Sequence, residues 1–250
     1  MVVMTPQGHI KVPGNALGYA ISGRNQYTLV TQVEQEAALC YLPGPTVLLE
    51  GARYEQNNII TIADVTLPEH KRSSFCLLNW VTHSYVRQDE TWNFRLWKVT
   101  NEVSCVDKLG NKTLLFRDAV VLDHGTGDVC SDINQKFPSC SSPAQGSMQP
   151  PGVVGILILY GPVFEHLASV FTDTCASQSL NLAQDTPSTH TARIQAHDCH
   201  VAFTTTRVQA GLVLVKFGAE TLDVAKDWLA TVLREEGTLL NNFGEEVSFN

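Results

Sequence analysis

Residues 92–122 read WNFRLWKVTNEVSCV-DKLGN-KTLLFRDAVVL, and this stretch decides the fold. Its two arms are rich in β-branched and aromatic residues, which favour strands. Between them, residues 107–111 contain Asp, Gly and Asn, which are typical of tight turns. The sequence therefore predicts an antiparallel hairpin with arms at 92–106 and 112–122.

Outside the hairpin, strand patterns continue for most of the chain. Similar β-branched or apolar runs predict strands at 26–33, 37–42, 53–67, 75–82, 153–160, 193–206 and 212–217. Two helices are expected late in the chain. One begins at Gly161-Pro162, because proline suits the first helical position, and the other runs from about Thr221 to Glu236 with one apolar stripe. Strands followed by two helices predict a mainly β fold with helices docked on it.

Residues 123–151 differ from the rest of the chain. They are rich in Ser, Gly, Pro, Asp and Gln and show almost no apolar periodicity. A structureless stretch of this length is unusual inside a compact domain, so we interpret it as a mobile insertion. The strand pattern resumes directly after it, and we therefore expect one domain over residues 1–250.

Composition and charge exclude several classes of partner. The chain has 250 residues with 17 basic and 25 acidic side chains, which gives a net charge of −8. The basic residues are spread out, so neither nucleic acid nor an anionic membrane surface is expected to bind. No apolar run is long enough for a transmembrane helix, and the N-terminus lacks the features of a signal peptide. Seven cysteines without a C-x-x-C pair argue against a disulfide framework, so we expect a cytoplasmic protein.

Two groups of residues could carry chemistry. His197, Cys199 and His200 resemble metal ligands, but alternate strand residues face opposite sides, so His200 would point away from the other two. Strand-end polar residues are the more economical interpretation. The carboxylates of Glu90, Glu102, Asp118 and Asp123 lie near strands that can pair, where they could act in acid–base chemistry or relay a hard cation. Structural roles, such as capping turns or pairing with Arg95 or Arg117, are the favoured interpretation, because surface carboxylates are the rule.

An ordered series of short motifs resembles the urease accessory proteins called UreD, or UreH in some bacteria, and most closely the eukaryotic members. The motifs are LPGP at 42–45, ARYEQ at 52–56, LLNWVT at 77–82, ETW at 90–92, NEV at 101–103 and FRDAVVL at 116–122. The positions that carry the resemblance are Pro43, Pro45, Tyr54, Gln56, Trp80, Glu90, Trp92, Asn101, Glu102, Arg117 and Asp118. The family's C-terminal third is resembled by three further segments, which are the helix opening at Gly161-Pro162, residues 211–217 and residues 228–229.

The sequence also departs from the family pattern. A Gly-rich motif expected in an early strand is absent, the segment that usually follows the strand ending at Gln32 is missing, and Asn79 replaces the usual Asp before Trp80. The region between Trp80 and Trp92 is altered as well. The resemblance therefore implies a divergent or N-terminally incomplete member.

The resemblance implies a layered or helix-like stack of many strands with two docked helices. It also implies a scaffold without catalytic activity that works with a UreF-type protein and a UreG-type GTPase on apo-urease. In this role nickel is in transit and no cofactor is tightly bound. A transit path suits weak oxygen ligands, so Glu90, Glu102 and Asp118 are the candidate residues.

Two alternatives to this role remain. The chain could be a β-fold interaction module that has lost the urease role, or a metal-dependent enzyme built around His197 and Cys199.

Overall fold

The computed structural model describes residues 2–4, 10–14, 25–83, 92–123, 129–138, 150–181, 200–208 and 211–244. Its strands are β1 (Val2–Met4), β2 (Ile10–Val12), β3 (Asn25–Val33), β4 (Ala38–Tyr41), β5 (Thr46–Leu48), β6 (Arg53–Ala63), β7 (Ser74–His83), β8 (Leu96–Val106), β9 (Lys112–Asp123), β10 (Val153–Tyr160), β11 (Val201–Arg207) and β12 (Val213–Ala219). Its helices are α1 (Val129–Lys136), α2 (Glu165–Asn181), α4 (Leu222–Glu236) and α5 (Thr238–Phe243), with short 3₁₀ turns at Glu69–Lys71 and Pro162–Phe164.

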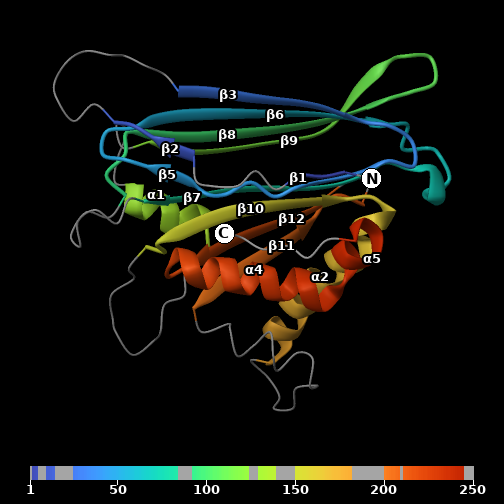
Figure 1. Ribbon diagram of the computed structural model, residues 1–250. Coiled ribbons are helices and arrows are strands. Elements are labelled where there is room, and N and C mark those ends of the chain that lie inside the picture. The colour runs from blue at the N-terminus through green and yellow to red at the C-terminus, as the bar shows by residue number, and fades with distance from the viewer. Residues whose placement is uncertain are drawn as a thin grey trace.

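The strands form two sheets. Sheet A contains β1, β4, β7, β10, β12 and β11 in that order, with β2 and β5 joined to it through β7. Sheet B contains β3, β6, β8 and β9 in that order. Figure 1 shows sheet B above sheet A, with α2, α4 and α5 on the far side of sheet A. The described chain is thus three layers, sheet on sheet and helices on sheet.

In its first half the chain passes repeatedly between the sheets. It runs from β3 in sheet B to β4 and β5 in sheet A, then to β6, β7 and β8 in alternation. Because each return enters in the same direction, β3, β6 and β8 pair in parallel, and so do β4 and β7. This coil agrees with the layered, helix-like β stack that the resemblance implies, and the mainly β fold class predicted from the sequence is confirmed.

The predicted hairpin is also confirmed. Strands β8 and β9 pair antiparallel from Leu96–Asp123 to Val106–Lys112, around a turn in which Asp107 accepts hydrogen bonds from Leu109 and Asn111. A register shift at Val103/Ser104 marks a β-bulge. The first arm is shorter than predicted, because residues 92–95 precede the strand.

The helix layer is held to sheet A by an apolar cluster. Trp228 of α4 packs on Phe217, with ring centroids 5.3 Å apart, and on Phe203 and Phe171. The amphipathic stripe predicted for residues 221–236 faces this cluster, and Thr221 caps the helix by accepting a hydrogen bond from the Val224 amide. Both late helices are therefore where the sequence places them, although the first begins with a 3₁₀ turn.

The described part of residues 123–151 contains a helix, so there the expectation of a structureless stretch is wrong. Residues 129–136 form α1, and Val129, Ile133 and Phe137 are buried in the core shared by the two sheets. Lys136 ties the helix to β9 by donating to the Val121 carbonyl at 2.7 Å. The apolar spacing of four residues was the signal for this helix, but its Ser- and Gly-rich flanks concealed it. Residues 124–128 and 139–149 lie outside the described part.

Three further differences concern element boundaries. The strand predicted at 53–67 ends at Ala63, where Asp64 begins a turn by accepting from the Thr66 amide. The strand predicted at 193–206 is described only from Val201, because residues 193–199 lie outside the described part. The short strand β5 and the helix α5 were not predicted, since three to six residues carry too little periodicity.

In the described part of the chain, no helix is long and apolar enough to cross a membrane. The buried cysteines at 40, 76 and 105 lie outside any disulfide.

Candidate functional site

A row of amide side chains lies buried between the two sheets. Gln56 and Asn58 come from β6, Asn79 from β7 and Asn101 from β8, and none is more than 6% exposed. We call these four residues the amide layer. Burying an amide group without a hydrogen-bond partner destabilises the folded state. The hydrogen bonds of these four side chains therefore decide whether the arrangement is stable.

Hydrogen bonds connect the whole layer. Gln56 Nε2 donates to Asn58 Oδ1 at 3.0 Å and to Asn79 Oδ1 at 2.9 Å. Asn58 Nδ2 donates to Asn79 Oδ1 at 2.9 Å and to Asn101 Oδ1 at 2.8 Å. Asn79 Nδ2 completes the network by donating to Asn101 Oδ1 at 3.2 Å. Since Asn79 belongs to sheet A and the other three to sheet B, the layer is a polar connection between the sheets.

Local sequence explains why these amides face inward. In β6, residues 54, 56, 58, 60 and 62 are buried and alternate with half-buried residues, as the two-residue period of a strand requires. The inward face thus carries Tyr54, two amides and two isoleucines. Tyr54 extends the network by donating to Gln56 Oε1 at 3.2 Å, and burial raises the pKa of its phenol to about 12.

One end of the layer lies at Asp118. Asp118 of β9 stands directly opposite Asn101 of β8, so the two side chains share the inward face. Both Asn101 Nδ2 and Asp118 Oδ2 are buried and have no hydrogen-bond partner. The buried amide donor needs an acceptor such as a water molecule, and the buried carboxylate oxygen needs a donor or a cation.

Glu102 lies on the other side of sheet B. It is half-buried and stands opposite the exposed Arg117, one position along from the Asn101–Asp118 pair. Successive strand residues point to opposite faces, so the structure places Glu102 and Asp118 on different faces of sheet B. Glu90, the third candidate carboxylate, lies outside the described residues.

The remaining motif positions brace the fold. Trp80 Nε1 donates to the Pro43 carbonyl at 2.8 Å, and the Pro45 carbonyl accepts from the Ile10 amide. Trp92 Nε1 donates to the Pro151 carbonyl at 2.8 Å. This hydrogen bond joins the segment that leads into β8 to the segment that leads into β10. Of the positions that carry the family resemblance, Tyr54, Gln56, Asn101 and Asp118 therefore belong to the layer or adjoin it, whereas Pro43, Pro45, Trp80 and Trp92 hold strands together.

The sequence did not reveal the amide layer as a unit. Gln56 and Asn101 were noted only as motif positions, Asn79 only as a departure from the family pattern, and Asn58 not at all. The available signal was the pair of amides on the apolar face of β6. The partners in β7 and β8 could not be identified, because they depend on how the sheets face each other.

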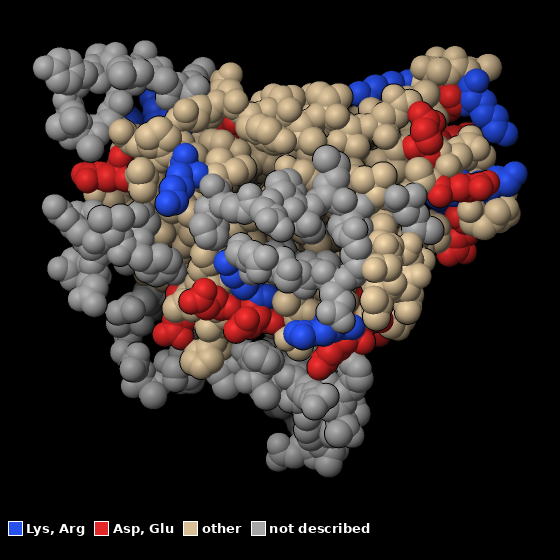
Figure 2. All heavy atoms as spheres, viewed as in Figure 1, with Lys and Arg blue, Asp and Glu red and all other residues tan. Residues whose placement is uncertain are grey.

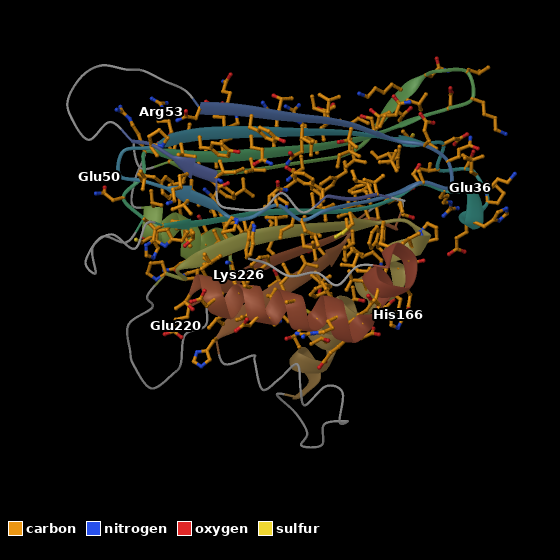
Figure 3. All side chains as sticks on the ribbon, in the orientation of Figure 1. Glu36, Glu50, Arg53, His166, Glu220 and Lys226 are labelled. Carbon is orange, nitrogen blue, oxygen red and sulfur yellow. The ribbon has the colours of Figure 1, made fainter. Side chains whose placement is uncertain are left out.

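The histidine and cysteine candidates do not form a described site. His197 and Cys199 lie outside the described residues, and His200 Nδ1 lies 2.8 Å from Glu220 Oε2 on the surface. Figure 3 shows Glu220 beside the start of α4, on the helix side of the molecule. Within the described ranges, no group of three or more His, Cys, Asp or Glu residues is placed to hold a metal ion.

Comparison with known proteins gives one family. The model of the UreD urease accessory protein family matches residues 3–242, nearly the whole chain. No curated protein matches the sequence.

Proposed function

The chain belongs to the UreD urease accessory protein family, and from this premise we propose that it acts as a non-catalytic scaffold in nickel delivery to apo-urease. In this proposal it works in a complex with a UreF-type protein and a UreG-type GTPase. The family match over residues 3–242 is the observation that carries the proposal, because it covers both sheets and both late helices.

The chemistry of the interior supports a role in handling a cation in transit. Amide and carboxylate oxygens bind divalent cations more weakly than a closed set of cysteines and histidines, so they allow release as well as binding. The amide oxygens of Asn79 and Asn101 already accept two hydrogen bonds each. Among the described residues, Asp118 Oδ2 and the amide Oδ1 of Asn134 are buried without a hydrogen-bond partner, and of these two only the Asp118 carboxylate can offer nickel a charged oxygen.

The departure at position 79 makes this interior less charged than the family pattern implies. Asn79 supplies a neutral oxygen where the family resemblance leads us to expect a carboxylate. With Asn79 bound into the amide layer, the carboxylate that the strand register places beside the layer is that of Asp118. A nickel path past the layer would therefore depend strongly on Asp118.

The first test is co-expression with UreF-type and UreG-type partners and with apo-urease. Co-purification reports assembly of the complex, and nickel-dependent urease activity reports delivery. The proposal expects both. A folded chain that neither co-purifies with these partners nor activates urease would contradict it.

The role of Asp118 is tested by Asp118→Asn against Glu102→Gln. Both changes neutralise a carboxylate on sheet B, but only the Asp118 side chain lies on the inward face of the sheet. We expect D118N to reduce nickel-dependent activation by about tenfold while the complex still forms, since its buried oxygen no longer carries charge. We expect the E102Q variant to support urease activation close to the wild-type level.

Several outcomes would remove these carboxylates from the proposed path. Full activation by D118N would exclude Asp118. Full activation by a Glu90→Ala/Glu102→Ala variant, with an intact complex, would exclude that pair. Loss of co-purification in D118N would instead assign Asp118 to assembly, so the readouts separate delivery from complex formation.

A further inference from the structure

β3 is an exposed edge of sheet B. It pairs in parallel with β6 on one side, and no described strand lies on its other side. Figure 1 shows β3 along the upper border of the molecule, away from the helix layer. An edge strand presents unpaired backbone N–H and C=O groups, which can bind another strand.

The other described edges carry charges, helix contacts or a short length that protect an edge strand, and β3 has neither charges nor a short length. Strand β9 carries four charged residues, and Lys136 of α1 occupies its Val121 carbonyl. Strand β11 lies against α2, where Arg207 pairs with Glu165 at 3.0 Å. Strands β1 and β2 have only three residues each. In contrast, β3 has nine residues without a charge or a proline, and the part of Figure 2 where Figure 1 places it is mostly uncharged.

The side chains of β3 are also incompletely covered on both faces. Val30 on the outward face is 71% exposed, and Tyr27 on the inward face is 37% exposed although its Oη lies 3.4 Å from Tyr41 Oη. Leu29 is only partly buried against the core. A strand added beside β3 would cover Val30 on one face and continue the core at Tyr27 and Leu29 on the other.

The residues of β3 that lie at equal distances from Leu29 are uncharged on both sides and suited to pair with one another. Reading outward in both directions, Thr28 and Val30 are both β-branched, Tyr27 stands at the position equivalent to Thr31, and Gln26 and Gln32 are identical. In an antiparallel pair of two such strands centred at Leu29, these equidistant residues stand opposite each other. The cross-strand pairs are β-branched, aromatic or amide, which stabilise sheets, and no like charges meet.

We propose that β3 pairs antiparallel with β3 of a second copy of this chain, about a two-fold axis at Leu29. The result is an isologous dimer in which the two four-stranded sheets become one continuous sheet. A contact between two strand edges buries less than the roughly 800 Å² per partner of a stable complex. We therefore expect a weak dimer whose population depends on protein concentration.

The register makes the test specific, because position 28 of one copy faces position 30 of the other. Thr28→Lys/Val30→Lys places lysine opposite lysine twice. Thr28→Lys/Val30→Glu places lysine opposite glutamate twice at the same two exposed positions. Leu240→Lys, on exposed α5, is the control for adding a charge elsewhere.

Sedimentation equilibrium of the purified full chain, without partners, measures the dimer. We expect a concentration-dependent dimer for the wild type and L240K, retention in the Lys/Glu variant, and a dissociation constant at least tenfold higher in the Lys/Lys variant. Circular dichroism and thermal unfolding check that all variants are folded.

Three results would overturn the proposal. The first is a wild type that stays monomeric at the highest soluble concentration. The second is a dimer that the Lys/Lys variant does not weaken, which would place the contact elsewhere. The third is equal weakening by the Lys/Lys and Lys/Glu variants, which would contradict the register.

Discussion

Asn57 and Asn58 are neighbours on β6 and identical in chemistry, yet the structure gives them opposite environments. Asn58 is fully buried in the amide layer, where its side chain makes hydrogen bonds with Gln56, Asn79 and Asn101. Asn57 is half-buried on the outward face of sheet B. At the scale of the residue, the face of the strand decides what an asparagine contributes.

This difference predicts unequal costs for the same substitution. Asn58→Leu removes three hydrogen bonds inside the layer and should lower the free energy of unfolding by about 2–3 kcal/mol. Asn57→Leu should change it by less than about 0.5 kcal/mol. Urea unfolding of both variants measures the values, and equal losses would contradict a structural role for the layer.

Tyr54 predicts an effect of alkaline pH. Burial raises its pKa to about 12, whereas a tyrosine in the unfolded chain loses its proton near pH 10. The unfolded state therefore binds fewer protons between these values, and stability that is fully present below pH 10 is lost as the pH rises through 12. Tyr54→Phe should show a shallower loss of unfolding free energy above pH 10. Identical pH slopes for variant and wild type would disprove this assignment.

At the scale of the element, the junction between β10 and α2 depends on one glycine. Gly161 has a φ of +88°, and a Cβ there would lie 2.2 Å from the Ser73 carbonyl oxygen. Pro162 then starts the 3₁₀ turn that leads into α2. The chain thus needs a left-handed conformation and a close backbone approach at the same point, and glycine alone allows both.

Gly110 in the hairpin turn is the matched control. Its φ is +84°, but nothing lies within 4 Å of a Cβ added there. Gly110→Ala should therefore cost only about 1 kcal/mol of unfolding free energy, from the backbone conformation. Gly161→Ala adds the clash with Ser73 and should cost clearly more. Chemical denaturation compares the two, and equal costs would show that the junction yields to the added methyl group.

At the scale of the whole molecule, the two sheets share one core. The cluster between them includes Ile60 and Val103 from sheet B and Leu77 and Ile156 from sheet A, all at most 1% exposed. A second cluster, around Trp228, joins sheet A to the helices. Because sheet A contributes to both clusters, neither sheet B nor the helix layer can detach without exposing apolar surface of sheet A.

This arrangement predicts cooperative unfolding. Tryptophan fluorescence, which reports on Trp97 in the first cluster and Trp228 in the second, should follow the same urea transition as far-UV circular dichroism. Two separate transitions would show that the chain contains two independent folding units.

The sequence by itself determined the elements that have a strong local pattern. The long strands, the hairpin turn at 107–111 and the helix at 222–236 follow from alternation, turn residues and an amphipathic stripe, all of which act over a few neighbouring residues. The motif series was sufficient to indicate the family, and the family match over residues 3–242 confirmed it.

Only the tertiary structure decided how these elements meet. The parallel pairing of β3, β6 and β8, the burial of α1, the amide layer and the inward face of Asp118 all depend on contacts between segments far apart in the chain. Local patterns carry no record of such contacts, because packing selects them by the total area buried and by the polar groups that must find partners. For this reason the sequence could offer Glu102 and Asp118 as equivalent carboxylates, while the fold placed them on opposite faces of one sheet.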